Sequence, residues 1–364
     1  MKLGVPKEKV AGEMRVATTP DVVKSLVSKG LQVVVESGAG DGSHYHDDAY
    51  VDAGATIADS AAAFACDLVA KVRKPTPEEV AQMTEGAVFI GQMEHCESDT
   101  VDAAMHAKKI KIVALERVPR ISRAQSMDVL SSQANIAGYR AVIEAANQYG
   151  RFMPLMMTSA GSAKPSRLVV LGVGVAGLQA IATARRLGAD VYAYDIRPET
   201  KEQIESLGAK AIELDIGESG SGEGGYAKEL SEEGKAKQQQ MLADELSKAH
   251  VIITTAQIPC RPAPELVTEE VVKKMREGSV IVDMAAGSGG NCPLSEADKV
   301  VTKHGVILVG HTNYPSMMAT DASAFYAKNI ANLLGIMLDS SEHGLVLKDL
   351  DEDEITAAAQ MKPE

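Results

Sequence analysis

A strand–turn–helix–strand pattern in the middle of the chain limits the possible folds more than any other feature of the sequence. Residues 167–197 read RLVVLGVGVAGLQAIATARRLGADVYAYDIR. The apolar run 168–171 is typical of a strand, a helical stretch follows, and a second apolar run ends at Asp195. Between the first strand and the helix stand three glycines at the spacing G-x-G-x-x-G, namely Gly172, Gly174 and Gly177. This combination predicts the first βαβ unit of a dinucleotide-binding domain.

Each part of this pattern has a physical role in binding a dinucleotide. The first glycine permits a tight turn, the second lets the backbone approach a pyrophosphate, and the third lets helix and strand pack closely. The free N–H groups at the start of the helix then face the phosphates. Asp195 lies 18 residues after Gly177, where a carboxylate accepts a hydrogen bond from an adenosine ribose and repels a 2′-phosphate. The sequence therefore predicts NAD(H) rather than NADP(H), although Arg197 is a residue type that can accommodate a 2′-phosphate.

Apolar runs rich in β-branched residues alternate with helical patterns in two series, the second of which begins at Arg167. The expected strands are residues 2–5, 32–36, 67–71, 87–90, 111–115, 168–171, 191–194, 210–212, 251–254, 280–283 and 306–309. The expected helices are residues 20–28, 76–83, 98–107, 131–149 and 317–338. Such alternation predicts parallel sheets covered by helices on both faces. We therefore expect an α/β protein with two Rossmann-like, doubly wound domains, joined by long helices and separated by a cleft.

The domain boundaries follow from these two series. A chain of 364 residues is long enough for about two domains. We expect a first domain at residues 1–130 plus 315–364, a connecting helix at 131–150 and the nucleotide-binding domain at 151–314. The acidic stretch 349–354 near the end of the chain predicts a loose tail.

Composition excludes several classes of function. The formal net charge is −13 and aromatic residues are scarce, so neither phosphate contacts nor base stacking favours a nucleic-acid partner. No run of about 18 apolar residues predicts a membrane span, and the N-terminus lacks the apolar core of a signal peptide. The eight histidines show no metal-ligand spacing, so we expect no metal site. The four widely spaced cysteines are expected to be free thiols in a reducing compartment.

Residues 120–140, RISRAQSMDVLSSQANIAGYR, have no interpretation from periodicity alone. They resemble the signature loop of the NAD(H)-binding component of proton-translocating nicotinamide nucleotide transhydrogenases. The resemblance extends through VPKE, GEMRVATTP, GVGVAGLQAIATARRLGA, DIRPETKEQIESLG, GGYAKE, TTAQIPCRPAP, AGSGGNCPLSE and VGHTNYPS. These blocks keep the family order from Met1 to about Ala331. The alanine dehydrogenases of the wider superfamily share much of this layout.

The resemblance implies a set of site residues. The loop that would contact the nicotinamide end of NAD(H) contains Arg120, Gln125, Asp128 and Ser131. Arginine and glutamine can donate to a carboxamide or a phosphate, while Asp128 can accept from a ribose or hold Arg120 in place. An ordinary ion pair between Arg120 and Asp128 is the alternative.

Further residues are implied around the nucleotide. Val175 would lie at the pyrophosphate turn, Asp195 and Arg197 at the adenosine ribose, and Gln238 on a nearby helix. Two residues depart from the family pattern, namely Gln257, where leucine is usual, and Cys260, where glycine is usual. Gly225 and Tyr226 match the mobile loop of the family. The glycine-rich segment 216–228 that contains them is interpreted either as a surface loop or as a lid over the nucleotide.

The residues that a substrate dehydrogenase needs are missing. In alanine dehydrogenases a histidine follows a strand of the first domain and an aspartate supports it, but here Gln92 and Gly287 stand at the corresponding places. Glutamine cannot transfer a proton at neutral pH. His95 lies three residues out of register, and Arg15 can bind a carboxylate, although a structural role is the expectation for it.

Hydride transfer between two nicotinamide rings needs neither acid nor base, only close and correct orientation. The sequence, with its resemblance, therefore predicts the NAD(H)-binding subunit of a transhydrogenase. NADP(H) would then bind to a partner component, and a separate membrane component would couple the reaction to proton movement. We expect a homodimer on the cytoplasmic side of the inner membrane, attached peripherally through partner subunits. An alanine-dehydrogenase-like enzyme is the main alternative, and a non-catalytic NAD-binding module is the second.

Overall fold

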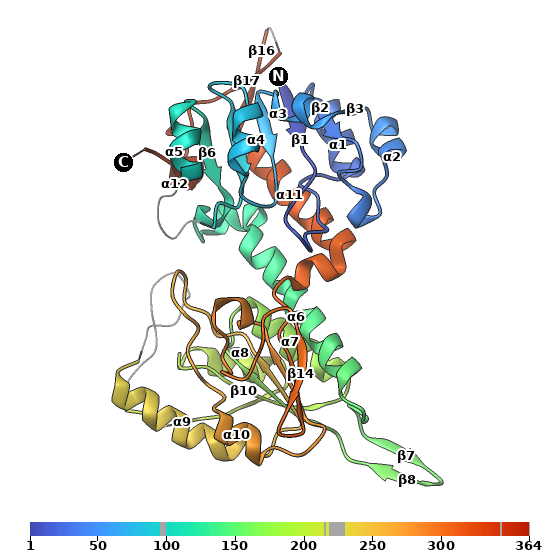
Figure 1. Ribbon diagram of the computed structural model, residues 1–364, viewed down its shortest axis with the longest axis vertical. Helices are drawn as coiled ribbons and strands as arrows, with labels where there is room; N and C mark the ends of the chain where they lie inside the picture. Colours follow the sequence, from blue (N-terminus) through green and yellow to red (C-terminus); the bar gives the residue numbers. More distant parts are fainter. Residues whose placement is uncertain (95–99, 215, 218–229, 343, 364) are drawn as a thin grey trace. The chain divides into compact units, whose positions relative to one another are not determined.

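The structure is a computed structural model that describes residues 1–94, 100–214, 216–217, 230–342 and 344–363. The chain divides into two compact units (Figure 1): unit 1 is Met1–Gln133 with Pro315–Glu364, and unit 2 is Ala134–Tyr314. Each unit contains a seven-stranded sheet in which parallel pairs predominate, with helices packed against it. The expected α/β class, with two Rossmann-like domains, is confirmed.

The sheet of unit 1 has the strand order β3-β2-β1-β4-β5-β6, extended by β18 at one edge. Its strands are β1 (Lys2–Val5), β2 (Gln32–Glu36), β3 (Thr56–Ala58), β4 (Leu68–Ala70), β5 (Val88–Gly91), β6 (Lys111–Ala114) and β18 (Gln360–Met361). All neighbouring pairs are parallel except β18 with β6. This is the doubly wound order of a dinucleotide-binding fold, with the reversal of direction between β1 and β4.

Helices cover both faces of this sheet. They are α1 (Pro20–Ser28), α2 (Asp47–Asp52), α3 (Ser60–Phe64), α4 (Pro77–Gln82), α5 (Thr100–Ala107), α11 (Ala319–Met337) and α12 (Glu354–Ala359). The core of one face joins the strands to α1, α11 and α12. The core of the other face joins them to α3, α4 and α5.

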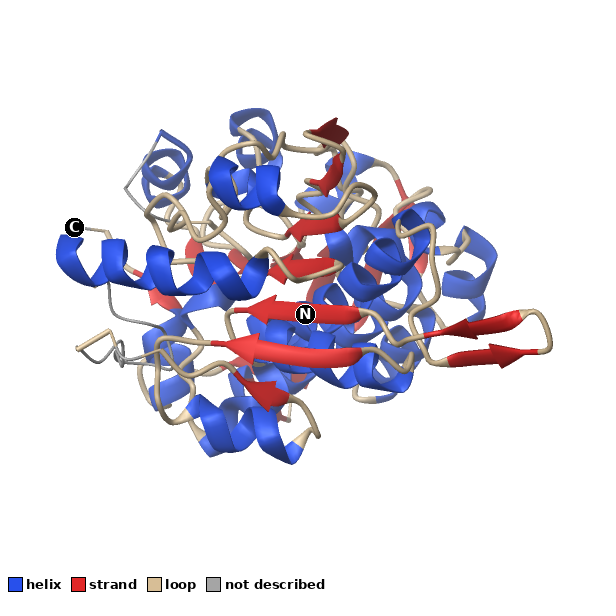
Figure 2. Cartoon of the chain, turned by 90° about the horizontal axis from the view of Figure 1, so that it is seen from below, coloured by secondary structure: helices blue, strands red, loops and turns tan. Residues whose placement is uncertain are grey.

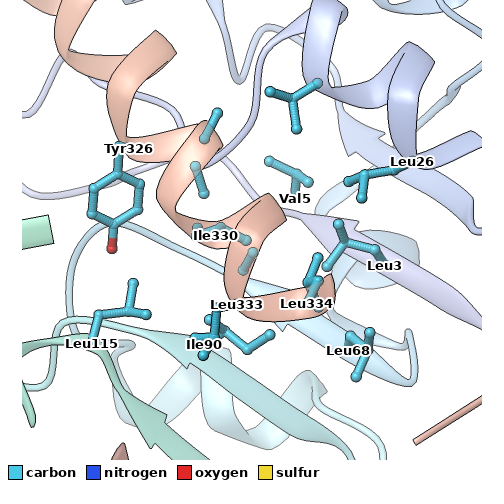
Figure 3. Packing of buried hydrophobic residues seen from close by; sticks show 14 of the residues in the cluster. Leu3, Val5, Leu26, Leu68, Ile90, Leu115, Tyr326, Ile330, Leu333 and Leu334 are labelled. Atoms are coloured by element: carbon cyan, nitrogen blue, oxygen red, sulfur yellow. The ribbon is translucent and has the colours of Figure 1, made fainter. Parts of the chain in front are cut away.

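Side-chain alternation along each strand supplies both cores, because successive residues point to opposite faces. Figure 3 shows Leu3 and Val5 of β1 in the first core, with Ile330 of α11. Between them Gly4 faces α3, where an added Cβ would lie 1.8 Å from the carbonyl oxygen of Ala63. Only glycine therefore allows α3 to pack this closely on β1.

The sheet of unit 2 has the order β11-β10-β9-β12-β13-β15-β14. Its strands are β9 (Arg167–Leu171), β10 (Asp190–Tyr194), β11 (Lys210–Ala211), β12 (Val251–Thr254), β13 (Val280–Asp283), β14 (Val300–Lys303) and β15 (Val306–Val309). All pairs are parallel except β14 with β15. The connections reverse direction between β9 and β12, so the carboxyl ends of these two strands form the switch point where ligands bind in such sheets.

The helices of unit 2 also lie on two faces. They are the greater part of α6 (Val129–Gln148), then α7 (Val175–Arg186), α8 (Thr200–Ser206), α9 (Glu232–Leu246) and α10 (Glu269–Lys274). Leu242 and Leu246 of α9 share a core with Val272 of α10. On α6, Gly138 permits a close approach to α7, because a Cβ there would lie 2.1 Å from the carbonyl oxygen of Ala176.

The acidic stretch near the C-terminus does not form the loose tail expected from its charge. Asp353 accepts from the backbone N–H of Ile355 at 2.9 Å and forms a bidentate pair with Arg123 at 2.7 and 2.9 Å. Ile355 and Ala359 are fully buried in the core of unit 1. The apolar residues that follow the acids, rather than the acids themselves, decide the structure here.

Two short hairpins lie outside the main sheets. They are β7 (Met156–Thr158) with β8 (Gly161–Ala163), and β16 (Leu338–Ser341) with β17 (Gly344–Leu347). Neither hairpin was among the expected elements, because both are short and lack a long apolar run. Within the described part of the chain, no helix is both long enough and apolar enough to cross a membrane.

Candidate functional site

The three glycines of the fingerprint form the turn between β9 and α7. Gly172 has φ +91°, in the left-handed region, and a Cβ there would lie 2.7 Å from Thr255 Oγ1. A Cβ on Gly177 would lie 2.0 Å from the carbonyl oxygen of Gly172. By contrast, a Cβ on Gly174 would meet no atom within 4 Å. Gly172 and Gly177 therefore allow close packing within the turn, whereas Gly174 borders open space at its surface.

This open space lies at the start of a helix. Gly174 is the N-cap residue of α7 and has no side chain to satisfy the N–H groups of the first turn. Val175, the first residue of the helix, is partly exposed. These N–H groups and the helix dipole favour an anion at the switch point of the sheet. The turn therefore fits the pyrophosphate of a dinucleotide.

Asp195 follows β10 and connects the end of that strand to the glycine turn. Its Oδ2 accepts from the backbone N–H of Val173 at 2.7 Å, and its Oδ1 accepts from the backbone N–H of Arg197 at 2.9 Å. The guanidinium of Arg197 donates to both oxygens at 2.9 Å. Hydrogen bonding to Asp195 raises the pKa of Arg197. The structure therefore gives Asp195 a second role that the fingerprint alone did not predict, which is to hold the turn.

The other residues expected around the nucleotide are placed by unit 2. Gln238 of α9 is buried, and its Nε2 donates to the hydroxyl of Tyr194 at 3.2 Å. Burial raises the pKa of Tyr194, which immediately precedes Asp195. The side chain of Gln257 is exposed and donates to the carbonyl oxygen of Met284 at 3.2 Å. Gly225 and Tyr226 lie outside the described residues.

Cys260 has a backbone φ of +60°, in the left-handed region that favours glycine. This conformation gives a physical reason for the glycine that is usual at this position. The structure holds Cys260 in a disulfide bond, which corrects the prediction of four free thiols. Cys66 and Cys292 are free and buried. The spacing of cysteines along the sequence does not show which of them the fold brings close enough to form a disulfide bond.

A buried carboxylate missed by the sequence reasoning organises the loop after β13. Asp283 is fully buried and accepts from Thr254 Oγ1 at 3.0 Å and from the backbone N–H groups of Asn291 and Cys292 at 3.1 and 3.0 Å. Asn291 Nδ2 donates to the carbonyl oxygens of residues 256 and 264. The loops after β12 and β13 are thus tied together at the switch point. The sequence did contain a signal for this buried carboxylate, because Asp283 ends an apolar strand and precedes a glycine-rich loop.

Unit 1 contains a pocket of about 380 Å³ beside the loop that leads into α6. Its lining consists of Pro119, Arg120, Ile121, Gln125, Asp128 and Ser131. The fold thus brings all four residues expected at the nicotinamide end to one cavity. Asp128 caps α6, because it accepts from the backbone N–H and the hydroxyl of Ser131 at 2.9 and 2.6 Å.

The loop carrying these residues is firmly anchored to unit 1. The carbonyl oxygen of Ser126 accepts from Nδ2 of Asn329 at 2.8 Å and from Nδ2 of Asn332 at 3.0 Å, both from α11. Oδ1 of Asn329 accepts from Ser132 Oγ at 2.7 Å. Met127 is buried next to these contacts. The pocket wall is therefore pre-organised by hydrogen bonds from a helix some 200 residues away along the chain.

Arg15 is fully engaged in a buried ion-pair network. It is 4% exposed, and its Nε and Nη2 donate to Glu13 at 2.7 Å each, while Nη1 donates to Gln133 at 2.9 Å. Burial alone would raise the pKa of Glu13, but its hydrogen bonds with Arg15 and the positive charge of Arg15 hold it at about 2. The expectation of a structural role for Arg15 therefore agrees with its contacts.

The positions that would carry a dehydrogenase acid and base hold groups without that chemistry. Gln92 is partly buried, and its backbone N–H donates to Val72 at 3.3 Å. Gly287 lies in a short 3-10 helix, where a Cβ would approach Thr312 Cγ2 to 3.3 Å. His95 lies outside the described residues.

Comparisons with known proteins identify the family of the chain. The family model described as "Alanine dehydrogenase/PNT, N-terminal domain" matches residues 4–137, and its C-terminal counterpart matches residues 141–362. An NAD(P) transhydrogenase alpha subunit of Rhodospirillum rubrum is 53% identical over 361 residues, which cover 97% of this chain and 94% of that protein. The alanine dehydrogenase of Bacillus subtilis is 30% identical over 355 residues, 91% of this chain and 86% of that protein.

A solved structure also covers nearly the whole chain. The crystal structure of a transhydrogenase from Sinorhizobium meliloti superposes with a TM-score of 0.89 and 44% identity, over 99% of this chain and 98% of that one. The two family models account for both sheets, and the relatives extend over the fingerprint and the pocket loop. The chain therefore belongs to the alanine dehydrogenase/PNT family.

Proposed function

We propose that this chain is the NAD(H)-binding subunit of a proton-translocating NAD(P) transhydrogenase. It would position NADH for direct hydride transfer to NADP⁺ held by a separate component. The pocket that collects Arg120, Gln125, Asp128 and Ser131 carries this proposal, because it offers polar groups for a nicotinamide end. The carboxylate of its Asp128 is already engaged as the cap of α6, where it accepts from the backbone N–H and the hydroxyl of Ser131. Relatives of this chain, a transhydrogenase alpha subunit at 53% identity among them, support the same activity.

Binding of the dinucleotide would use unit 2 at the adenosine and pyrophosphate end. The exposed edge at Gly174 and the N–H groups from Val175 onward would face the two phosphates. Asp195 would accept from the ribose hydroxyls beside its contacts with the glycine turn and Arg197. A 2′-phosphate there would meet this carboxylate, so the site favours NAD(H) over NADP(H).

Binding at the nicotinamide end would use the pocket of unit 1. Arg120 and Gln125 can donate to the carboxamide, and Asp128, held by Ser131, can accept from the ribose. When bound, NADH supplies the hydride. The side chains orient the ring, and no protein group has to take or give a proton for that transfer.

The remaining assignments belong to the same proposal. NADP(H) would occupy the partner component, and a separate membrane component would carry the protons. This chain would work as a homodimer on the cytoplasmic side of the membrane. Gly225 and Tyr226 would cover the bound nucleotide, with Gln238 and Gln257 lying near it.

A reconstituted exchange reaction tests the proposal. The purified chain is mixed with a separately produced NADP-binding component of a transhydrogenase, and hydride transfer from NADH to thio-NADP⁺ is followed by absorbance. We expect rapid exchange that requires both proteins. NADH oxidation by the chain alone with pyruvate and ammonia would instead establish an alanine-dehydrogenase-like enzyme. Tight NADH binding with neither activity would establish a non-catalytic module.

Variants of the pocket separate positioning from binding. Gln125→Ala and Asp128→Asn are expected to slow single-turnover hydride transfer more than they raise the Kd for NADH, because they alter the orientation of the ring. Val51→Asp, at an exposed site of α2, is the matched control and should leave both quantities unchanged. Equal losses of rate and affinity would mean that the pocket residues only bind.

A further inference from the structure

The amino ends of the parallel strands of unit 2 lie at the opposite end of the sheet from the glycine turn. Here β9 begins at Arg167, His250 immediately precedes β12, and Arg276 lies between α10 and β13. The chain enters β9 from the β7–β8 hairpin, which projects beyond the sheet and helices of its unit (Figures 1 and 2). Ligands of such sheets bind outside the carboxyl ends of the strands. Polar groups gathered at the amino end therefore require a different explanation.

The two ring nitrogens of His250 have contacts that fix where its hydrogen lies. Nδ1 accepts from the backbone N–H of Arg167 at 2.8 Å. A neutral imidazole carries one hydrogen, so Nε2 is the donor of this ring. Nε2 nevertheless lies 3.3 Å from Nη1 of Arg276, and a guanidinium has donors only. Two donors cannot form a hydrogen bond with each other, so this pair faces a place where an acceptor is missing.

Two further donors lie beside this pair. The ring of Tyr149, which directly follows α6, is 6% exposed and stacks on the ring of His250 with the centroids 6.2 Å apart. Burial raises the pKa of Tyr149, and the charges of Arg151 and Arg276 oppose that rise, so both arginines are near this ring. Among the residues that the structure describes, neither the hydroxyl of Tyr149 nor the guanidinium of Arg151 has a hydrogen-bond partner.

The positive charge of this group is not neutralised by neighbouring acids. Arg167 has its own partner, because Nη2 donates to Glu245 at 2.5 Å. Glu277, which follows Arg276 in the chain, forms no ion pair within the described part of unit 2. Burial lowers the pKa of His250, and the positive charges of the three arginines around it lower that pKa further. The imidazole is therefore uncharged at neutral pH and offers one neutral N–H.

We propose that Tyr149, Arg151, His250 and Arg276, the amino-end cluster, bind a phosphate group. Two arginines match the charge of a phosphate, which approaches −2 at pH 7, and their planar forks match its oxygens. The hydroxyl and the imidazole N–H supply neutral donors to the remaining oxygens. A carboxylate, with one charge and two oxygens, would use fewer of these groups. The phosphate group belongs either to a free anion or to a phospholipid headgroup, and the site is separate from the one used for hydride transfer.

An alternative explanation is that the arginines only interact with helix dipoles. Arg151 lies three residues after the end of α6, and Arg276 lies two residues after the end of α10. Cations near the C-terminal ends of helices stabilise them by about 0.3–1 kcal/mol at exposed sites. That role needs no ligand and does not explain why Nε2 of His250 faces a guanidinium. The two explanations differ in whether the protein binds phosphate.

Calorimetric titration of inorganic phosphate into the full-length chain tests the proposal. The titration is made at constant ionic strength with saturating NADH, which occupies the glycine turn, and we expect one phosphate per chain. Arg151→Gln and Arg276→Gln should each weaken binding about 10-fold, because each replaces a charge-assisted hydrogen bond by a neutral one. His250→Asn keeps an acceptor for the N–H of Arg167 but removes the ring N–H, and should weaken binding about 3-fold. Lys274→Gln, at an exposed cation of α10, is the matched control and should bind phosphate like the wild type.

Two results would overturn the proposal. The first is a wild type that binds neither phosphate nor vesicles, and the second is an unchanged affinity in both arginine variants whose circular dichroism shows that they are folded. Flotation with vesicles of phosphatidylcholine and phosphatidylglycerol distinguishes the source of the phosphate group. If the wild type floats but does not bind free phosphate, and Arg276→Gln does not float, the ligand is a lipid headgroup. Failure to bind NADH would count against the proposed function alone, because the variants still locate the phosphate at the amino-end cluster.

Discussion

Adding one methyl group at two different glycines of the fingerprint should separate folding from nucleotide binding. At Gly177 a Cβ would lie 2.0 Å from the carbonyl oxygen of Gly172, so α7 has to move away from the turn. Overpacking of this kind costs about 1–3 kcal/mol. The obstacle is backbone rather than a flexible side chain, so we expect the upper end of that range for Gly177→Ala.

Gly174→Ala should have the opposite profile. Its φ of −81° suits alanine, and its Cβ would meet nothing within 4 Å. Alanine is a poorer N-cap than glycine, but it loses less backbone entropy on folding by about 0.4–1 kcal/mol, so the two effects offset and the free energy of unfolding should change by only about a few tenths of a kcal/mol. The new methyl group would occupy the edge that faces the pyrophosphate. Loss of one charge-assisted hydrogen bond there is worth about 1.5–3 kcal/mol, which raises the Kd for NADH roughly 10- to 100-fold.

Urea unfolding followed by circular dichroism, together with fluorescence titration of NADH, measures both quantities for each variant. We expect Gly177→Ala to be less stable than the wild type, and Gly174→Ala to be as stable as the wild type but to bind NADH weakly. A Gly174→Ala protein that binds NADH like the wild type would refute the assignment of the open edge to the pyrophosphate. A Gly177→Ala protein as stable as the wild type would refute the packing argument.

Three further perturbations follow from the contacts of unit 1. Asn329→Leu removes a donor to the carbonyl oxygen of Ser126 and should displace the pocket loop. A displacement of about 1 Å should slow hydride exchange about 100-fold. An unchanged single-turnover rate would show that this contact does not position the pocket. Glu13→Gln leaves the buried charge of Arg15 without its main partner and should lower the free energy of unfolding at pH 7 by about 3–5 kcal/mol, as measured in urea. The pKa of Glu13 in the folded protein, about 2, lies below its usual 4.5. The ionised Glu13 therefore stabilises the folded protein above pH 4.5, and this contribution is lost as the pH falls toward 2. If wild type and Glu13→Gln unfolded identically in acid, this account of Glu13 would be contradicted. Burial raises the pKa of Glu8 to about 7, so stability should fall as the pH rises from 4.5 to 7, and Glu8→Gln should flatten that part of the curve.

The glycine turn between β9 and α7 could be predicted well because its signals are local. The glycine spacing, the apolar runs and Asp195 lie within 31 consecutive residues, where strand and helix geometry fix the separation of each group. The structure places the turn between β9 and α7 as expected. What the sequence missed there was Asp195 accepting from the N–H of Val173, because that contact depends on the parallel pairing of β9 with β10.

The choice of residues expected at a nicotinamide end depended on resemblance, because the loop at residues 120–131 has no periodicity to interpret. Its residues come together in a pocket only because α11 holds the carbonyl oxygen of Ser126 through two asparagines. Similarly, the buried Arg15 could be interpreted from sequence as a carboxylate ligand. Its bonds to Glu13 and Gln133 show that the fold has already used its donors.

The sequence by itself therefore determined the two α/β units, the position of the fingerprint and the absence of a dehydrogenase acid and base at Gln92 and Gly287. These properties depend on residue type and on short-range spacing, both of which the chain carries directly. Only the tertiary structure decided that the acidic C-terminal stretch packs into unit 1, how Arg15 and Asp195 are hydrogen-bonded, and that Tyr149, His250 and Arg276 meet at one end of the sheet of unit 2. Each of these depends on contacts between residues that are far apart in the sequence and that the packing within one unit brings together. Many other residues of the same types could have made these contacts, so the sequence does not show which ones do.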